Sequence, residues 1–180
     1  MKNPLLVFSL VLLLCFAFGC QNKAEKAELE KFRAQAKLEE QNKEIVKRFF
    51  DAWDKEDMGT IKELLAPEYI YYLPSNSATP RTREEVIEGT KVFYRGFPDV
   101  SWKIEESIAA GNRIISRWIM RGTHQREFEG FPATGNKIET SGILITRIEN
   151  GKIVENREDW DMLGLMMQLG LELKPKEVKK

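Results

Sequence analysis

The stretch RIENGKIVENREDWD, residues 147–161, decides the fold of this chain. The Asn150-Gly151 pair stands between two apolar runs, and such a pair is a strong signal for a tight hairpin because both residues tolerate positive φ. The residues after the turn, 152–160, are therefore expected to form a strand. Side chains alternate between the two faces of a strand, so the sequence also predicts which residues point toward the interior.

Four carboxylates crowd into the second half of this stretch, and alternation separates their expected roles. Glu158 shares a face with Val154 and Trp160, so it is expected to point toward the interior. Burial would raise the pKa of its carboxyl and make it a usable acid or base near neutral pH. The alternative is a buried structural acid that pairs with an arginine or a histidine.

The other three acids have simpler interpretations. Glu155 and Asp159 fall on the polar face, where solvent or neighbouring Arg and Lys side chains would accommodate them. Asp161 stands directly before the segment MLGLMMQLG, so it is expected to be the N-cap of a short closing helix.

Outward from this strand, helical patterns come first and strands follow. A core-facing helix is indicated from Ile45, a second short one by GTIKELLAP up to Pro67, and a third after Thr82, whose spacing to Glu85 fits a capping box. EYIYYLP is expected to be a short strand, and four further strand candidates fill residues 100–160. This order predicts an α+β fold.

The N-terminus is expected to lie outside that fold. Residues 1–19 combine Lys2 with an apolar run too short to span a bilayer, which is typical of an export signal. The run ends in AFGC, so the segment resembles a bacterial lipoprotein signal with Cys20 as the lipidated residue. Residues 20–42 read as a charged helical tether, or alternatively as a coiled-coil partner helix. Residues 43–172 form the predicted domain, and 173–180 a charged tail.

Composition excludes several classes of function. The formal net charge is zero, with 28 basic and 28 acidic side chains spread along the chain, so no nucleic-acid partner is expected. One histidine and two cysteines cannot build the usual zinc clusters, and no glycine-rich phosphate loop occurs, so neither metal nor cofactor is expected. The single histidine, His124, ends a strand with Ser116 and Trp118, and it is either a structural residue or a second catalytic group.

Four segments in order carry a resemblance to a known family: GFPDVSW, RWIMRGTHQREFEGFPATG, RIENGKIVENREDWD and LGLMMQLG. From about residue 43 to 170 the chain resembles the SnoaL-like polyketide cyclase or ester cyclase family, within the nuclear-transport-factor-2-like superfamily. The resemblance implies a cone, in which a curved antiparallel sheet is wrapped by about three helices around an apolar pocket.

The resemblance also implies a chemistry. In characterised cyclases of this family, an acid on the last strand removes a proton next to a carbonyl and returns it to the new alkoxide during an aldol ring closure. Glu158 occupies that position, with glutamate where aspartate is common. On the preceding strand, Leu144 stands where those cyclases have a polar partner, His or Asp. His124 and Trp160 match common family positions.

Two functions remain open at this stage. The first is a cofactor-independent enzyme that acts on a small apolar carbonyl compound. The second is a lipoprotein of the bacterial cell envelope that binds a hydrophobic ligand without turnover, which Leu144 favours. A homodimer through the sheet is a further expectation. Either pocket would use a wall drawn from the following residues: Trp53, Tyr72, Phe93, Phe97, Trp102, Trp118, Leu144, Asn156 and Trp160.

Overall fold

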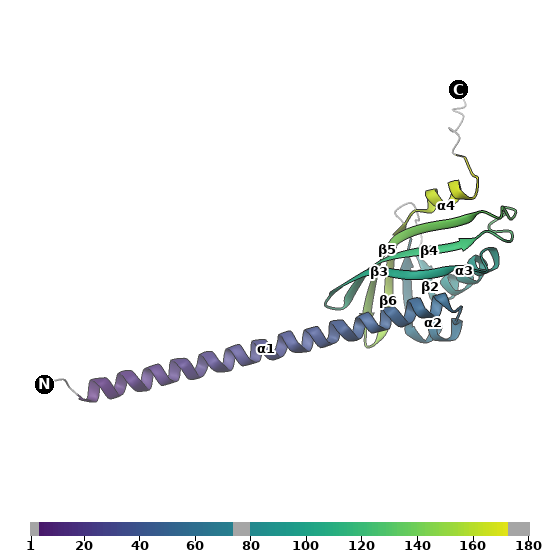
Figure 1. Cartoon of the computed structure of the whole chain (residues 1–180). Coiled ribbons are helices and arrows are strands. Elements are labelled where there is room, and N and C mark those ends of the chain that lie inside the picture. The colour runs from purple at the N-terminus through teal and green to yellow at the C-terminus, as the bar shows by residue number, and fades with distance from the viewer. Residues whose placement is uncertain (1–3, 74–79, 173–180) are drawn as a thin grey trace, which may run out of the picture. The chain divides into compact units, whose positions relative to one another are not determined.

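The structure is a computed structural model that describes residues 4–73 and 80–172 of the chain. In chain order the elements are α1 (Pro4–Asp54), α2 (Met58–Leu64), β1 (Leu65–Tyr72), β2 (Arg81–Thr82), α3 (Arg83–Gly96), β3 (Ser101–Ala110), β4 (Arg113–Thr123), β5 (Lys137–Glu149), β6 (Lys152–Trp160) and α4 (Met162–Gln168). The first half contains helices α1 and α2, strands β1 and β2, and helix α3, and an antiparallel meander follows (Figure 1).

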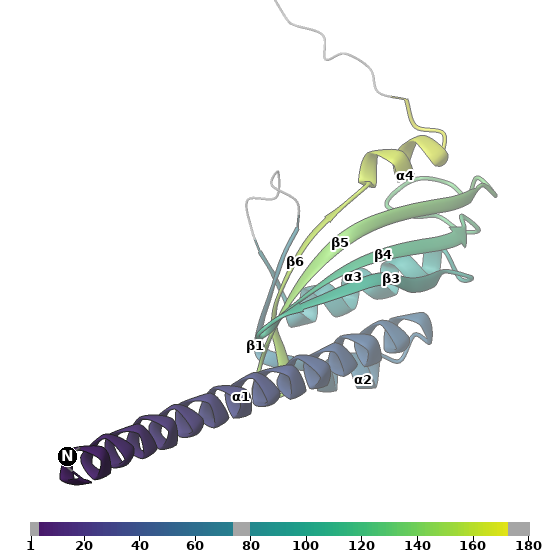
Figure 2. The same cartoon turned by 60° about the vertical axis from the view of Figure 1, so that its left-hand side comes forward.

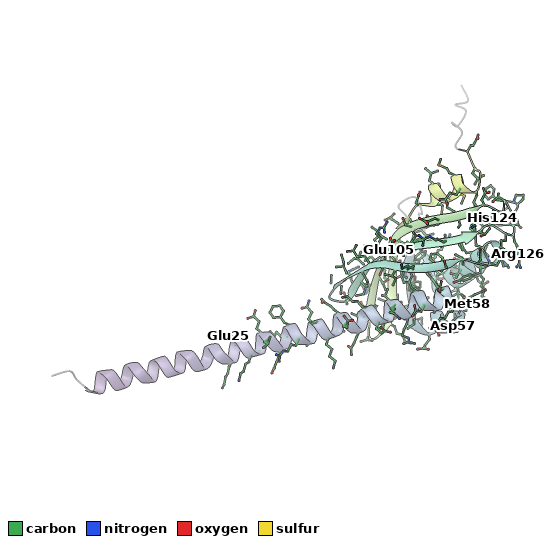
Figure 3. All side chains as sticks on the ribbon, viewed as in Figure 1. Glu25, Asp57, Met58, Glu105, His124 and Arg126 are labelled. Atoms are coloured by element: carbon green, nitrogen blue, oxygen red, sulfur yellow. The ribbon has the colours of Figure 1, made fainter. Side chains whose placement is uncertain are left out.

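The chain divides into two compact units, Met1–Leu38 and Glu39–Lys180. The first unit is helical from Pro4 onward, and every side chain described in it, from residue 23 to residue 38, is exposed. Figure 3 shows Glu25 pointing away from this helix. In the part of the chain that the structure describes, no helix is both long and apolar enough to cross a membrane.

The predicted lipid site and charged tail fall where the structure gives little information. Cys20 lies within α1, but its side chain is outside the described residues. The first three residues of the expected signal segment and the expected tail, 173–180, are also outside the described residues. The lipoprotein assignment therefore stays a prediction.

The second unit is built on one six-stranded sheet with the order β2-β1-β6-β5-β4-β3. Strands β3 to β6 form the expected antiparallel meander, and the turn at Asn150 and Gly151 has positive φ at both residues. The expectation of a wholly antiparallel sheet is wrong, because β1 runs parallel to β6. β1 pairs with the edge of β6 that β5 leaves free. No local turn signal predicts this pairing, because the two strands are far apart in the chain.

The helices pack against one face of this curved sheet. The end of α1, together with α2 and α3, lies on that side, as both views of the ribbon show (Figures 1 and 2). Val46, Phe49 and Trp53 of α1 are buried, in agreement with the predicted core-facing helix. The capping box of Thr82 and Glu85 begins α3 as expected. In contrast, α2 ends at Leu64, and Pro67 lies inside β1 rather than ending the helix.

The closing helix is held at both ends. Asp161 accepts a hydrogen bond from the backbone N–H of Gly164 at 2.7 Å, which confirms the predicted N-cap. At the other end, the Gln168 side chain exchanges two hydrogen bonds with the backbone of Glu139 in β5, at 2.7 and 2.8 Å. These contacts fix α4 against the sheet, and the α+β architecture is the one that the sequence predicts.

Candidate active site

Glu158 points into the interior of the cone, as strand alternation predicts. Its side chain is 6% exposed, and its neighbours on β6, Arg157 and Asp159, are exposed on the opposite face. The carboxyl group lines a cavity bounded by the sheet, α3 and α4. A carboxyl in this position is separated from bulk water and surrounded by apolar walls.

Tyr71 is the direct partner of this carboxyl. The Tyr71 hydroxyl donates a hydrogen bond to Oε2 of Glu158, and both groups are buried. Burial raises the pKa of Glu158 to about 7, against the opposing effects of the Tyr71 hydroxyl and the Trp118 indole N–H, both of which favour the charged form. Among the described residues Oε1 has no hydrogen-bond partner, so this oxygen is available to a substrate.

Leu144 lies directly opposite Glu158 on β5 and offers it no hydrogen bond. The hydroxyl that reaches Glu158 comes from the other side, from Tyr71 on β1. The sequence did not identify Tyr71 as the partner of Glu158. Alternation along EYIYYLP places Tyr69 and Tyr71 on one face, but the parallel pairing with β6 was needed to select that face.

The cavity wall is rich in aromatic side chains. All four tryptophans of the chain line it, as does Phe93, so five of the nine predicted wall residues are in place. The rings are in mutual contact: Trp102 lies 5.3 Å from both Trp53 and Trp118 between ring centroids. The cavity volume is about 170 Å³, and it opens to solvent at its mouth. An apolar cavity of about 150 Å³ can hold benzene, so this one suits a small apolar molecule.

The other four predicted wall residues do not line the cavity. Tyr72 is on the opposite face of β1, where the Arg157 guanidinium lies 4.2 Å from its ring centroid. Phe97 is fully buried behind Phe93, with 4.7 Å between the stacked rings. Leu144 and Asn156 are also fully buried, and Asn156 lies two residue pairs from Glu158 along the β5–β6 ladder.

His124 also lies behind the wall rather than on it. Its ring stacks on Phe97 with 5.1 Å between centroids, and its Nδ1 accepts a hydrogen bond from the backbone N–H of Thr134 at 3.3 Å. The side chain is fully buried just beyond the end of β4, and Figure 3 shows where it lies. Its catalytic role stays a prediction, which this position does not support.

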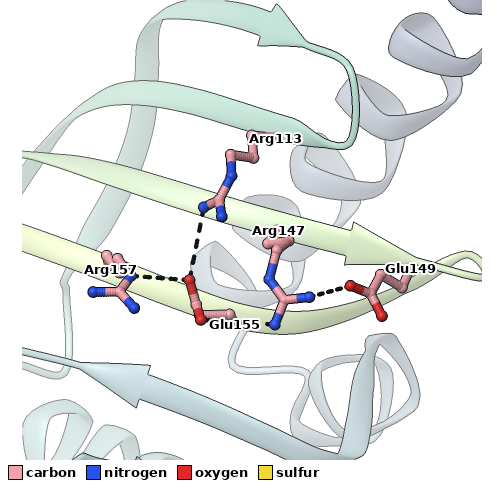
Figure 4. Close-up of polar contacts among 5 residues, drawn as sticks. All are labelled: Arg113, Arg147, Glu149, Glu155 and Arg157. Atoms are coloured by element: carbon pink, nitrogen blue, oxygen red, sulfur yellow. Dashed lines mark hydrogen bonds and ion pairs between the residues drawn. The ribbon is translucent and has the colours of Figure 1, made fainter.

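Glu155 lies on the outer face of the sheet beside arginine side chains, as predicted. Glu155 pairs with three arginines, Arg157 at 2.9 Å and Arg113 and Arg147 at 3.7 Å each (Figure 4). The Arg157 hydrogen bond and the charges of all three arginines hold the pKa of the Glu155 carboxyl below its usual range. Glu155 and Glu158 are only three residues apart, but their pKa values shift in opposite directions. Glu155 is held as an anion, whereas Glu158 titrates near neutral pH.

Known proteins that resemble this chain identify its family. Residues 43–169 match the family model described as SnoaL-like polyketide cyclase. The chain belongs to the SnoaL-like polyketide cyclase family. The family fold agrees with the cone described above, and its members are similar to this chain over the second unit. No curated protein matches the chain.

Solved structures share the fold of this chain. The chain is similar to "wild-type IdmH, a putative polyketide cyclase from Streptomyces antibioticus", with 28% identity and a TM-score of 0.66, over 72% of this chain and 99% of that one. It is also similar to a "Putative SnoaL-like polyketide cyclase from Jannaschia Sp. CCS1", with 24% identity and a TM-score of 0.68, over 76% and 96%. "AclR a putative hydroxylase from Streptomyces galilaeus" has 23% identity, a TM-score of 0.68, and coverage of 73% and 97%. The last two comparisons show the fold alone.

No metal site is evident within the described residues, where no three side chains of His, Cys, Asp or Glu come together. The polar groups that line the cavity include the Glu158 carboxyl, the Tyr71 phenol and the tryptophan indoles. Such a set can transfer protons and donate hydrogen bonds to an oxygen.

Proposed function

We propose that this SnoaL-like protein is a cyclase-type enzyme that performs acid/base chemistry on a small apolar carbonyl compound, without a cofactor. The observation that carries the proposal is the Glu158 carboxyl, which is buried in an aromatic cavity and has a pKa of about 7. A general acid/base works best when its pKa is near the working pH. Family membership supports a cyclase-type reaction.

In the proposed reaction, the Glu158 carboxylate removes a proton from the carbon next to a carbonyl group. The electron pair of the C–H bond then forms a carbon–carbon bond to a second carbonyl of the same molecule, and the resulting alkoxide takes the proton back from Glu158. The ring closes and the carboxylate is regenerated. The aromatic wall keeps water away from the carbanion, and the Tyr71 hydroxyl holds the carboxyl in place.

A panel of apolar dicarbonyl compounds, followed by mass spectrometry and NMR of the products, tests this proposal. Glu158→Gln is the matched control, because it keeps the shape of the side chain and removes its acid/base function. Cyclised product that depends on Glu158 supports the proposal. Equal product formation by the variant argues against the proposal. So does the absence of product from every compound in the panel.

The second candidate is a binding protein without turnover, and Leu144 is the observation that favours it. This residue is fully buried opposite Glu158, where a polar group would otherwise assist catalysis. A stable complex with an apolar compound, recovered unchanged after incubation with the protein, would favour this alternative.

We also propose that the protein is an exported lipoprotein of a bacterial envelope, anchored through Cys20. The apolar run before Cys20 supports the idea. Metabolic labelling with an alkyne fatty acid tests it: Cys20→Ser should abolish labelling, whereas Cys15→Ser should not. A homodimer through the outer sheet face, where Ile143 is 49% exposed, remains part of the proposal, and analytical ultracentrifugation tests it.

A further inference from the structure

Arg81 is a cation at the mouth of the cavity. It belongs to β2, where it pairs with Tyr71 on β1, and both side chains line the cavity. Its Nη1 would lie 3.6 Å from a methyl group placed on Gly89, so the guanidinium extends over α3 at this point. The side chain is exposed, which places the charge at the rim and the Tyr71–Glu158 pair further inside.

The charge of Arg81 has no close partner within residues 4–73 and 80–172: none of the ion pairs found there includes it. Burial and Glu158 raise the pKa of the Tyr71 phenol, and the nearby charge of Arg81 opposes this rise. The hydrogen bonds from Thr82 hold the pKa of the Glu85 carboxyl below its usual range, and Arg81 adds a smaller effect; this carboxylate accepts a hydrogen bond from the Thr82 backbone N–H at 2.7 Å in the capping box. Glu129, which also lines the cavity, forms no ion pair with Arg81.

The cavity thus combines an apolar interior with one available cation at its entrance. We infer that Arg81 determines specificity, and that the substrates or ligands of this cavity carry a carboxylate, which Arg81 binds while the apolar body lies against the tryptophans. A guanidinium and a carboxylate match in shape and can form two parallel hydrogen bonds. One cation balances one carboxylate, whereas a phosphate dianion would keep an excess negative charge.

This inference rests on the same cavity as the proposed function and names the class of molecule that it takes. The carboxylate would orient the substrate with its reacting carbons toward Glu158. The preference for an anion would be strongest at low salt, because an exposed charge pair is screened by ions.

Binding of two matched probes tests the inference without any need for turnover. The probes are 5-phenylpentanoate and 5-phenylpentan-1-ol, which share an apolar body and differ in charge. Quenching of tryptophan fluorescence is the readout, because all four tryptophans line the cavity. A pH of about 6 keeps the probe ionised and Glu158 mostly protonated, which limits repulsion inside the cavity.

The wild-type chain should bind the acid about 5- to 20-fold more tightly than the alcohol. Arg81→Gln should remove this difference and leave the affinity for the alcohol unchanged. Arg81→Glu should bind 5-phenylpentylamine in preference to the acid. Arg83→Gln is the matched control: Arg83 is two residues away, pairs with Glu84 at 2.9 Å and does not line the cavity, so the preference for the acid should persist.

Equal binding of both probes by the wild-type chain overturns the inference, and so does a preference for the acid that survives in Arg81→Gln. In either case the apolar cavity and the proposed function remain. If neither probe binds, the inference fails together with the premise of an apolar ligand. If the preference is lost in Arg81→Gln while the dicarbonyl panel gives no product, the inference stands and the enzyme proposal fails.

Discussion

The hydroxyl of Tyr71 donates a hydrogen bond to the carboxylate of Glu158, although 87 residues separate them in the chain. The bond joins the two strands of the sheet that run parallel, β1 and β6. It stabilises the charged form of a carboxyl that burial would otherwise keep protonated. The pKa of Glu158 is therefore a balance between desolvation, which raises it, and the Tyr71 hydroxyl together with the Trp118 indole, which lower it.

Removing the hydroxyl should shift that balance. Tyr71→Phe should raise the pKa of Glu158 by about one unit or more, because a hydrogen bond to a charged group contributes ~1.5–3 kcal/mol. If Glu158 is the base, activity at neutral pH should fall about fivefold or more, since fewer molecules carry the carboxylate. NMR titration of the carboxyl and the pH profile of turnover measure the two effects.

Tyr94→Phe is the control for this variant. Tyr94 also lines the cavity and is buried, but its hydroxyl donates to the backbone carbonyl of Trp53 rather than to Glu158. Its removal should leave the pKa of Glu158 unchanged. An equal shift in both variants would show that the titration responds to general loosening of the cavity and not to the Tyr71 bond.

Local patterns predicted the interior direction of Glu158 and the two helix caps. These features depend on contacts within a few residues, as for Asp161, which bonds to Gly164, and Thr82, which bonds to Glu85. Alternation along β6 was sufficient for Glu158 because the pairing with β5 is regular between residues 155 and 160.

The partner of Glu158 could not be predicted in this way. Tyr71 and Tyr72 are adjacent and chemically identical, so only the pairing of β1 beside β6 decides which one reaches the carboxyl. The sequence left His124 open between a structural and a catalytic role, and its surroundings come from a distant segment too: the loop that contains Thr134 covers its ring. Both outcomes depend on contacts between distant segments.

The raised pKa of Glu158 makes stability depend on pH. Between about pH 4.5 and 7 the folded protein holds a proton on Glu158 that the unfolded chain releases, so the free energy of unfolding should fall as pH rises. The decrease is roughly 3 kcal/mol, at ~1.4 kcal/mol per pH unit. Urea titrations across this range should show the slope in the wild type, and the slope should be missing from Glu158→Gln. Parallel curves for the two proteins would contradict the assignment.

The outer acid should behave differently. Glu155→Gln removes the anion shared by Arg113, Arg147 and Arg157, so the free energy of unfolding should fall by about 1–3 kcal/mol. The pKa of Glu158 and the binding of cavity ligands should not change, because the two acids lie on opposite faces of β6. Denaturant unfolding and fluorescence titration separate these effects. A change in ligand affinity would show that the faces are coupled.

The close packing of the tryptophans beside β5 gives a further prediction. A methyl group on Gly142 would lie 2.5 Å from a ring carbon of Trp118 and 2.6 Å from Cβ of Trp160, both on the cavity wall. Gly142→Ala should therefore cost about 1–3 kcal/mol of stability and weaken ligand binding.

Gly89→Ala is the matched variant for this experiment. Gly89, in helix α3, also lines the cavity. A methyl group there would lie 3.6 Å from its nearest atom, Nη1 of Arg81, which is an ordinary van der Waals distance. Its substitution should be neutral or stabilise the protein by about 0.5–1 kcal/mol. Thermal unfolding of both variants gives the comparison, and equal destabilisation would indicate that the Gly142 contacts are not tight.

The pKa of Glu158 decides whether this carboxyl can serve as the acid/base of the cavity. NMR titration of the carboxyl, assigned with Glu158→Gln, requires neither a substrate nor a product. The account predicts a pKa of about 7, as expected for a desolvated acid held by Tyr71 and ready for proton transfer. A value at or below the ordinary ~4.3 would contradict it, because Glu158 would then be a solvated or ion-paired anion and not the acid/base of this cavity.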